Sequence, residues 1–299
     1  MEKKYLLHML TSAKNLSPFD ANMAYDAGWD ACIPYIQVES DEVKGLVEDA
    51  IFSRGPSGVK RTGLFIGGRD MHEAMEMLET CQKSMVPPFV VSAFADPSGA
   101  FTTAAAMVAK VEKALRDGHG EGLSGQRIVA LGGTGPVGSA AAVIAANAGA
   151  RVTILGRQKE KSDRAAELCN QKYGADQTVD GEANDQLDQL LGETDVVFAS
   201  AAAGIQLVSK EQMANAPRLK VAADVNAVPP SGIHGLGVMD DGSPIEDSQS
   251  GAVGIGALAI GNVKYQTQHR LLQQMRETEE PVYFHFEHAF EVARQCASE

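Results

Sequence analysis

A glycine-rich turn carries the residues whose types and spacing best suit chemistry. Its residues match the pattern GxGxxG: Gly133, Thr134, Gly135, Pro136, Val137 and Gly138. An apolar segment, 128–131, precedes the turn, and an alanine-rich segment suited to a helix follows it. In this context Gly133 would make the tight turn, Gly135 would let the backbone approach a pyrophosphate, and Gly138 would let helix pack against strand. A bare glycine-rich turn is the alternative, but the flanking strand and helix favour a dinucleotide site whose phosphates meet the helix N-terminus.

The end of the next expected strand, 151–156, indicates which dinucleotide binds. An NAD site usually places Asp or Glu there to accept from the ribose 2′-hydroxyl. This chain instead has Arg157, and Lys161 follows four residues later. Because a guanidinium and an ammonium suit a 2′-phosphate, the sequence predicts NADP as the preferred coenzyme and NAD as the second choice. The alternative is a solvated basic start to a helix, since Glu160 dilutes the positive charge.

Further coenzyme contacts are expected where other strands of the same sheet end, because a nicotinamide and its hydride donor would meet there. The candidates are Ala201, Ala202, Asp224, Asn226 and Gly256. The small side chains of the first two would let a ring lie flat against backbone. Asp224 and Asn226 could instead be structural loop caps, and helix packing is the alternative for Gly256.

Polar residues elsewhere could hold a flat substrate ring. The catalytic candidates are Asp20, Asp96 and Lys264, and the substrate-binding candidates are Ser98, Thr102, Thr103 and Asn226. A carboxylate commonly pairs with the donor edge of a guanidine-like ring, such as the amino-pyrimidinone of a pterin. Either aspartate could instead cap a helix.

Alternating strand and helix patterns predict an α/β protein of two domains, with the ligand cleft between them. A first set of strands is expected at 5–10, 33–38, 62–68 and 86–97, with helices at 41–52 and 70–85. A second set, at 127–132, 151–156, 195–200 and 219–225, with helices at 136–148, 159–173 and 209–215, indicates a doubly wound parallel sheet of the Rossmann type. The helical stretches 257–277 and 286–297 are expected to pack back on the first domain. We therefore expect a smaller α/β substrate domain over 1–104 and 265–299, and a Rossmann domain over 105–264.

Composition excludes several classes of function. The formal net charge of −13 over 299 residues repels phosphate, which argues against nucleic acid or an anionic membrane as the partner. Neither the four cysteines nor the seven histidines fall in metal-ligand spacing, so no metal is expected. No apolar stretch approaches the roughly 20 residues of a membrane span. Scattered reduced thiols then suit a cytoplasmic protein.

Several longer segments together resemble the methylene-tetrahydromethanopterin dehydrogenases of methylotrophic and related bacteria. They are HMLTSAKNLSPFDANMAYDAG, IFSRGP, RTGLFIGG, VPPFVVSAFADPSGAFTTAAAMVA, GGTGPVG, ADVNAVPPSGIHG and VGIGALAIGNVKYQTQHRL. The resemblance implies oxidation of methylene- to methenyl-tetrahydromethanopterin with NAD(P), as part of formaldehyde oxidation. It also implies a first domain similar to that of the folate dehydrogenases, a Rossmann second domain and a homo-oligomer. Members of that family differ in coenzyme and fall into two branches. At Arg157 and Lys161 the chain is similar to the branch that strictly requires NADP, whereas the rest of the chain is similar to the branch without these two basic residues.

The implied reaction fits the candidate residues. Removing a hydride from a carbon between two nitrogens leaves a delocalised amidinium cation, so no general base is required. Positioning and negative potential help instead, which Asp20 or Asp96 could supply while Lys264 orients a ring or carbonyl oxygen. The same chemistry on methylene-tetrahydrofolate remains open as an alternative. A non-catalytic NADP-sensing module and a shikimate-type dehydrogenase are disfavoured, the first by the number of converging glycine and polar loops, the second because no Lys and Asp pair of the expected kind stands out.

Overall fold

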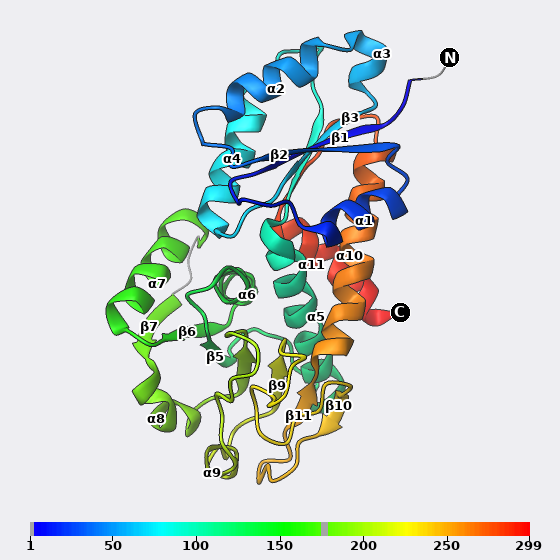
Figure 1. Cartoon of the computed structure of the whole chain (residues 1–299). Coiled ribbons are helices and arrows are strands. Elements are labelled where there is room, and N and C mark those ends of the chain that lie inside the picture. Colours follow the sequence, from blue (N-terminus) through cyan, green and yellow to red (C-terminus); the bar gives the residue numbers. More distant parts are fainter. Residues whose placement is uncertain (1–2, 175–178) are drawn as a thin grey trace. The chain divides into compact units, whose positions relative to one another are not determined.

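The structure, a computed structural model, describes residues 3–174 and 179–299. Two units divide the chain, and the colours of Figure 1 follow them along the sequence. The first comprises Met1–Thr102 with Tyr265–Val292, and the second Thr103–Lys264 with Ala293–Glu299. Each is described by itself below.

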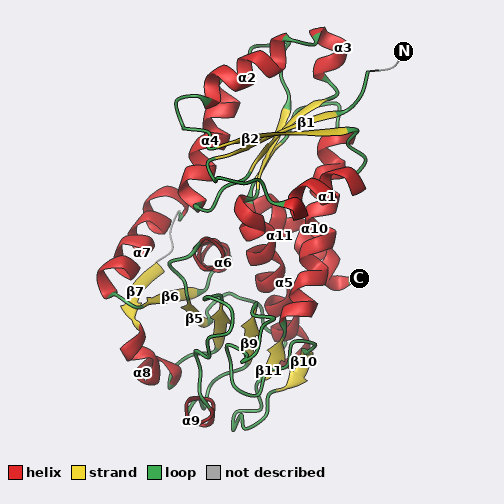
Figure 2. Cartoon of the chain, in the orientation of Figure 1, coloured by secondary structure: helices red, strands yellow, loops and turns green. Residues whose placement is uncertain are grey.

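A five-stranded parallel sheet of strand order β12-β4-β3-β1-β2 forms the centre of the first unit. Its strands are β1 (Leu6–Thr11), β2 (Ala31–Ile36), β3 (Thr62–Ile66), β4 (Ser92–Ala95) and β12 (Tyr283–Phe284). The helices are α1 (Pro18–Asp26), α2 (Val43–Phe52), α3 (Gly55–Val59) and α4 (Met71–Lys83), drawn red in Figure 2. Every residue of β3 and β4 is buried, as expected for parallel strands covered on both faces.

The chain also has three long helices: α5 (Ala100–His119), α10 (Ala257–Glu277) and α11 (Phe286–Ser298). Within the first unit α10 is anchored by Trp29, whose indole N–H donates to the carbonyl oxygen of Leu272 at 3.1 Å. The Phe101 and Phe286 rings meet edge to face, with centroids 5.4 Å apart. The closing segment from Tyr265 to Val292 therefore belongs to the first unit, whereas Ala293–Glu299, at the end of α11, belongs to the second. Within the described part of the chain, no helix is apolar enough over a sufficient length to cross a bilayer.

The second unit holds a seven-stranded sheet of order β10-β11-β9-β8-β5-β6-β7, parallel except for β10. Its strands are β5 (Arg127–Leu131), β6 (Arg151–Gly156), β7 (Val179–Ala183), β8 (Val196–Ala199), β9 (Val221–Asp224), β10 (Asp241–Pro244) and β11 (Val253–Ile255). Its other helices are α6 (Pro136–Asn147), α7 (Lys159–Tyr173), α8 (Leu187–Leu191) and α9 (Lys210–Ala214). This is the predicted doubly wound fold.

The middle of this sheet is where a ligand crevice is expected. β5 pairs with β6 on one side and with β8 on the other, so the connections after β5 and β8 leave in opposite directions. A crevice outside the carboxyl ends of the strands forms at such a switch point. The glycine-rich turn lies there, directly after β5.

Strands that the sequence pattern missed lie mostly at the sheet edges. β7 and β10 have the sequences VDGEA and DGSP, which carry few β-branched or aromatic residues. β2 was predicted two residues too late, at 33–38, because the left-handed Gln37 (φ 55°) ends the strand at Ile36. These segments are strands because a neighbouring strand pairs with them, and the pattern of a single segment does not contain that information.

Candidate functional site

The turn after β5 is shaped by its glycines. Gly132 has φ 72°, in the left-handed region, and the backbone N–H of Gly133 returns to the Ala130 carbonyl oxygen at 3.2 Å. The left-handed residue of the tight turn is therefore Gly132, one position before the glycine that the sequence favoured. Gly135 is the N-cap of α6, and Pro136 opens the helix.

The other glycines of the motif differ in the space around them. A Cβ on Gly133 would lie 2.7 Å from both the Ala130 carbonyl oxygen and the Ile154 side chain. A Cβ on Gly138 would lie 2.5 Å from Gly133 Cα, so this glycine lets α6 pack closely on the turn that precedes it. Around Gly135 the nearest atom, the Gly132 carbonyl oxygen, would be 3.4 Å away. Gly135 also lines a cavity at this turn, so a ligand there could approach its backbone.

A cavity of about 390 Å³ opens at this turn. It is lined by Gly132, Thr134, Gly135, Leu155, Gly156, Arg157, Asn184, Ser200, Ala201, Ala202, Ile205 and Leu207. Five of the predicted coenzyme residues are among them: Thr134, Gly135, Arg157, Ala201 and Ala202. Gly133, Pro136, Val137 and Gly138 belong to the turn and helix start but do not line the cavity. The helix N-terminus with its unpaired N–H groups suits an anion at this place.

Arg157 alone is charged among the described residues that line the cavity. Its guanidinium and the exposed Lys161 ammonium have no hydrogen-bond or ion-pair partner within the described residues. Lys159, by contrast, contacts Asp163 at 2.9 Å and Glu182 at 3.4 Å, and Asp163 and Glu182 raise its pKa. Arg157 and Lys161, the two basic residues that the sequence predicts as coenzyme contacts, thus form no ion pair within the described residues, unlike Lys159.

Several lining residues were not predicted, for two reasons. Asn184 follows β7, a strand that the sequence pattern did not reveal. Ile205 and Leu207 lie several residues beyond β8, in a segment with no periodic pattern of its own. Gly132 and Ser200 stood next to predicted residues, and the position directly after each strand was the signal that could have found them.

Asp224 and Asn226 are engaged by their own loop. Asp224 is 2% exposed, and its carboxylate accepts from the backbone N–H groups of Asn226 at 2.9 Å and Gly232 at 2.6 Å. Burial raises the pKa of Asp224, although these backbone donors act in the opposite direction. The Asn226 side chain accepts from Val228 N–H at 2.9 Å and donates to the Pro230 carbonyl oxygen at 2.8 Å. Neither residue lines the cavity, and both geometries are those of loop caps.

Gly256 also makes room for the chain itself. A Cβ there would stand 2.2 Å from the Gly237 carbonyl oxygen and 2.6 Å from that of Val238. The absence of a side chain at Gly256 is thus required by the backbone at 237–238. Gly256 is not among the residues that line the cavity.

In the first unit, Asp96 and its neighbours form the start of α5. One Asp96 oxygen accepts from the backbone N–H of Phe101 at 2.9 Å, and the other from the Thr102 hydroxyl at 2.6 Å. Both side chains are fully buried. Ser98 has φ 52°, and its hydroxyl donates to the Gly68 carbonyl oxygen at 2.7 Å. This is a helix cap on a strained turn, the alternative that the sequence left open for Asp96.

The remaining substrate candidates differ in burial. Asp20 occupies the first turn of α1, is 2% exposed, and accepts from the Gln268 side-chain amide at 2.7 Å. That bond joins α1 to α10 inside the first unit. Thr103 on α5 and Lys264 on α10 are both partly buried. Within the described residues, no cluster of three or more His, Cys, Asp or Glu side chains could hold a metal.

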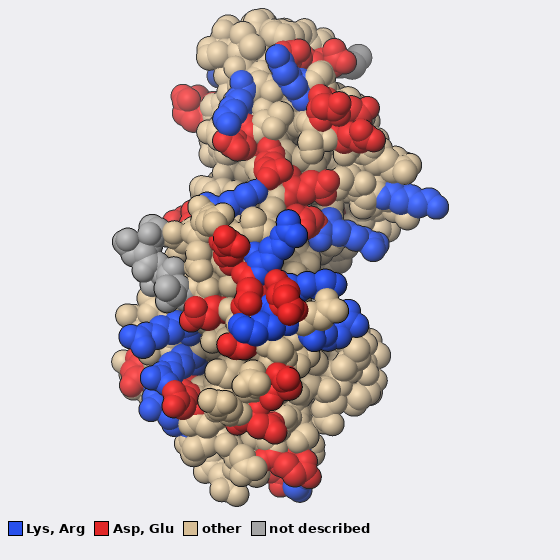
Figure 3. All heavy atoms as spheres, turned by 90° about the vertical axis from the view of Figure 1, so that its left-hand side faces the viewer, with Lys and Arg blue, Asp and Glu red and all other residues tan. Residues whose placement is uncertain are grey.

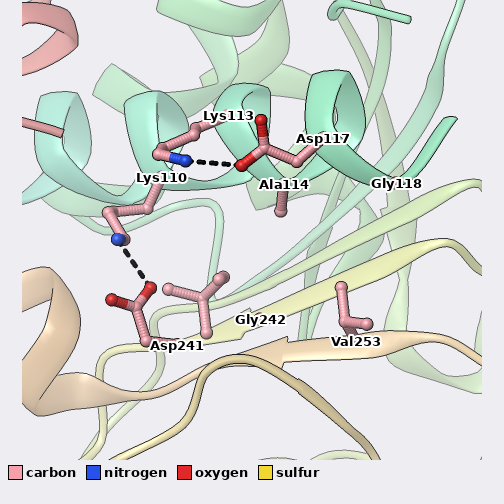
Figure 4. A pocket seen from close by; sticks show the side chains of 9 residues that line it. Lys110, Lys113, Ala114, Asp117, Gly118, Asp241, Gly242 and Val253 are labelled. Carbon is pink, nitrogen blue, oxygen red and sulfur yellow. Dashed lines mark hydrogen bonds and ion pairs between the residues drawn. The ribbon is translucent and has the colours of Figure 1, made fainter. Parts of the chain in front are cut away.

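A second cavity of about 390 Å³ has a different electrostatic character (Figure 4). It lies in the second unit, which also holds the Arg157 cavity, between α5 and the strands β10 and β11. Lys110 pairs with Asp241 at 2.6 Å, and Lys113 pairs with Asp117. Because its charges are matched within its own wall, this cavity offers a phosphate less than the Arg157 cavity does.

The surface charge is mixed on the face shown in Figure 3. Acidic and basic side chains are interspersed among the described residues visible there, without a continuous basic band. With the net charge of −13, this surface favours local anion recognition over binding to an extended polyanion.

Comparisons with known proteins match the chain to dehydrogenases. Residues 18–98 match the family model for the N-terminal part of methylene-tetrahydromethanopterin dehydrogenase, and residues 114–231 match that for shikimate / quinate 5-dehydrogenase. A Methylorubrum extorquens protein described as NAD(P)-dependent methylenetetrahydromethanopterin dehydrogenase is 44% identical over 98% of each chain. A second protein of that bacterium, described as bifunctional protein MdtA, is 34% identical over 99% of this chain and 100% of its own.

Solved structures show the same fold at low sequence identity. Quinate dehydrogenase from Corynebacterium glutamicum, in complex with NAD, has a TM-score of 0.54 at 13% identity, covering 92% of this chain and 98% of its own. The 5-ketofructose reductase of Gluconobacter has a TM-score of 0.51 at 16% identity, covering 98% and 99%. These likenesses concern the fold alone.

Proposed function

The chain belongs to the methylene-tetrahydromethanopterin dehydrogenase family, and from that premise we propose that it oxidises methylene-tetrahydromethanopterin with NADP as its preferred coenzyme. The product would be methenyl-tetrahydromethanopterin, in one-carbon metabolism. Methylene-tetrahydrofolate is the less favoured substrate, because the relative of 44% identity is described by the methanopterin reaction.

The observation that carries the coenzyme assignment is the unpaired Arg157 in the cavity wall. In an NAD site a carboxylate at this strand end would accept from the ribose 2′-hydroxyl and repel a 2′-phosphate. Here β6 ends at Gly156, and Arg157 follows with no partner among the described residues. A guanidinium can bind a phosphate through two parallel hydrogen bonds, which supports NADP over NAD.

The residues present fit a bound dinucleotide. Gly132 and Gly135 would bring backbone near the pyrophosphate, which the N-terminus of α6 would bind. Thr134, Ala201 and Ala202 would pack beside it, and Arg157 with Lys161 would hold the 2′-phosphate. Once bound, the nicotinamide supplies the hydride acceptor. The chain's part is to orient the coenzyme and exclude water around it.

For the pterin we propose Asp20 as the principal carboxylate. Both aspartates are buried, but Asp96 accepts from the residues that begin α5, whereas Asp20 lies in the first turn of α1 and accepts from the Gln268 side-chain amide at 2.7 Å. A carboxylate near the substrate would stabilise the amidinium charge that develops when the hydride leaves, and no group need accept a proton. Lys264 would orient a ring or carbonyl oxygen, and Ser98 and Thr103 would contact the substrate. Thr102 and Asn226, also predicted as substrate contacts, are instead bonded to Asp96 and to the 204–230 loops.

The test is an assay of the purified protein with each methylene carrier and each coenzyme. The absorbance of the reduced coenzyme measures the rate. We expect turnover with methylene-tetrahydromethanopterin and a higher kcat/KM for NADP than for NAD. Faster turnover of methylene-tetrahydrofolate would move the substrate assignment to that carrier. Coenzyme binding without turnover of either carrier would point to the sensing module instead.

We further propose that the protein is cytoplasmic and forms a homo-oligomer, as the resemblance implies. The substrate and the coenzyme are small soluble metabolites, which supports the first proposal. Light scattering on the purified protein tests the second, and a mass equal to one 31.6 kDa chain would contradict it.

A further inference from the structure

One wall of the Arg157 cavity is an irregular segment, 200–207, which we call the wall segment. It supplies Ser200, Ala201, Ala202, Ile205 and Leu207 to the lining. Its start is tied to the sheet, because the backbone N–H and hydroxyl of Ser200 both donate to the Leu131 carbonyl oxygen, at 2.9 and 3.1 Å. After that the segment has no helix or strand of its own until α9. Its shape must therefore depend on contacts to other parts of the chain.

The loop that follows β9 provides those contacts. The backbone N–H groups of Leu207 and Val208 donate to the Gly232 carbonyl oxygen at 2.7 and 3.0 Å. In return, His234 N–H donates to the Val208 carbonyl oxygen at 3.0 Å. These bonds fix the far end of the wall segment to residues 232–234.

In the middle of the wall segment, the contact to this loop is made by Asn226. Its side-chain oxygen accepts from the backbone N–H of Gly204 at 3.3 Å. The same oxygen also accepts from the backbone N–H of Val228 at 2.9 Å, and the amide nitrogen donates to the Pro230 carbonyl oxygen at 2.8 Å. Because the backbone N–H of Asn226 also donates to the buried Asp224, four hydrogen bonds hold Asn226 in place. A chain of hydrogen bonds thus runs from the end of β9 through Asp224 and Asn226 to Gly204.

We propose that Asn226 is a positioning residue that sets coenzyme affinity by fixing the wall segment through Gly204. This inference rests on the proposed use of the cavity for a coenzyme, but it assigns Asn226 no contact with that coenzyme. Arg157 would distinguish NADP from NAD, whereas Asn226 would act on both equally. An unfixed wall segment must be ordered at each binding event, and that ordering weakens affinity.

The experiment compares Asn226→Ala with the wild type and with Asn215→Ala, which changes an exposed asparagine at the end of α9. Hydrogen exchange of the coenzyme-free protein reports the mobility of 200–208. Calorimetric titration gives the Kd of NADP and of NAD. We expect faster exchange at 200–208 and Kd values for both coenzymes raised about tenfold, as loss of one or two hydrogen bonds would give. The ratio of the two Kd values should stay that of the wild type.

A second variant reaches the same hydrogen-bond chain from its other end. A Cβ on Gly232 would lie 2.9 Å from an Asp224 carboxylate oxygen, so Gly232→Ala displaces the group that holds Asn226. It should reproduce the phenotype, and the Kd effects of the double variant should be less than additive. Exchange or Kd values equal to the wild type in the folded variants would overturn the inference. Failure of the wild type to bind either coenzyme would instead overturn the proposed function.

Discussion

Gly138 packs so closely on Gly133 that a Cβ on Gly138 would stand 2.5 Å from Gly133 Cα. The contact holds the first turn of α6 against the turn that precedes it. The N–H groups at the start of α6 therefore keep a fixed direction toward the cavity. Phosphate binding would therefore depend on the contact between Gly138 and Gly133, although neither glycine lines the cavity.

Gly138→Ala tests that dependence. The added methyl would have to displace backbone, so we expect coenzyme affinity to fall at least tenfold and the unfolding free energy to drop by about 1 to 3 kcal/mol. Titration calorimetry and urea unfolding measure the two effects. The matched control is Gly261→Ala on α10, where a Cβ would meet nothing within 4 Å. That change should leave coenzyme affinity unaltered, and equal loss of affinity in both variants would refute the packing argument.

Arg157→Ala should reduce the preference for NADP. A charge-assisted hydrogen bond to the 2′-phosphate contributes about 1.5 to 3 kcal/mol, so the ratio of kcat/KM for NADP to that for NAD should fall roughly 10- to 100-fold. NAD kinetics should change little, because that coenzyme lacks the phosphate. Lys159→Ala serves as control, since Lys159 is already paired with Asp163 and Glu182. An unchanged ratio in Arg157→Ala would remove the basis of the NADP assignment.

Asp96→Ala and Asp20→Ala should differ in their kinetics. Loss of Asp96 removes the buried acceptor of the Phe101 N–H and of the Thr102 hydroxyl, so we expect the unfolding free energy to fall by about 2 to 4 kcal/mol with little direct effect on the reaction. Loss of Asp20 removes the acceptor of the buried Gln268 amide and should also lower stability, but it should in addition lower kcat/KM for the methylene carrier, as should Lys264→Ala. Urea unfolding and steady-state kinetics separate the two effects. Near-normal turnover with unchanged Michaelis constants in both Asp20→Ala and Lys264→Ala would show that the pterin binds elsewhere.

His285 predicts a pH dependence of stability. Burial and the adjacent His288 lower the pKa of His285 to about 4, and these outweigh the half-exposed Glu287, 4.0 Å away. Because the pKa is lowered by folding, the unfolded chain takes up the proton first. Stability is therefore complete above the unfolded pKa of about 6.5 and falls as the pH drops toward 4.

The matched variant is His285→Gln. Between pH 7 and 4.5 the wild type should lose about 2 to 3 kcal/mol more unfolding free energy than this variant does. His119→Gln, at the exposed end of α5, should follow the wild type. Parallel urea-unfolding curves for wild type and His285→Gln at both pH values would contradict the account.

The elements that sequence predicts best are those whose pattern is complete within one segment. The predicted ranges 151–156, 159–173 and 257–277 coincide with β6, α7 and α10. An apolar run or a helical period decides such elements locally. β10 is a strand only because β11 pairs with it, and its sequence DGSP carries no strand pattern.

The residues of the candidate site likewise differ in whether a local pattern predicts them. The glycine motif and Arg157 were found because each follows a predicted strand by a fixed spacing. Asn184 and Ile205 were missed, since only the folded sheet brings them to the same cavity. Whether Asp96 and Asn226 face a ligand or their own loops depends on backbone donors that no spacing reveals.

The most direct measurement is calorimetric titration of the wild-type protein with NADP and with NAD under the same conditions. The account predicts saturable binding of both coenzymes, with a lower Kd for NADP because Arg157 lines the cavity and no carboxylate is among its described lining residues. Tighter binding of NAD, or no binding heat with either coenzyme, would contradict it.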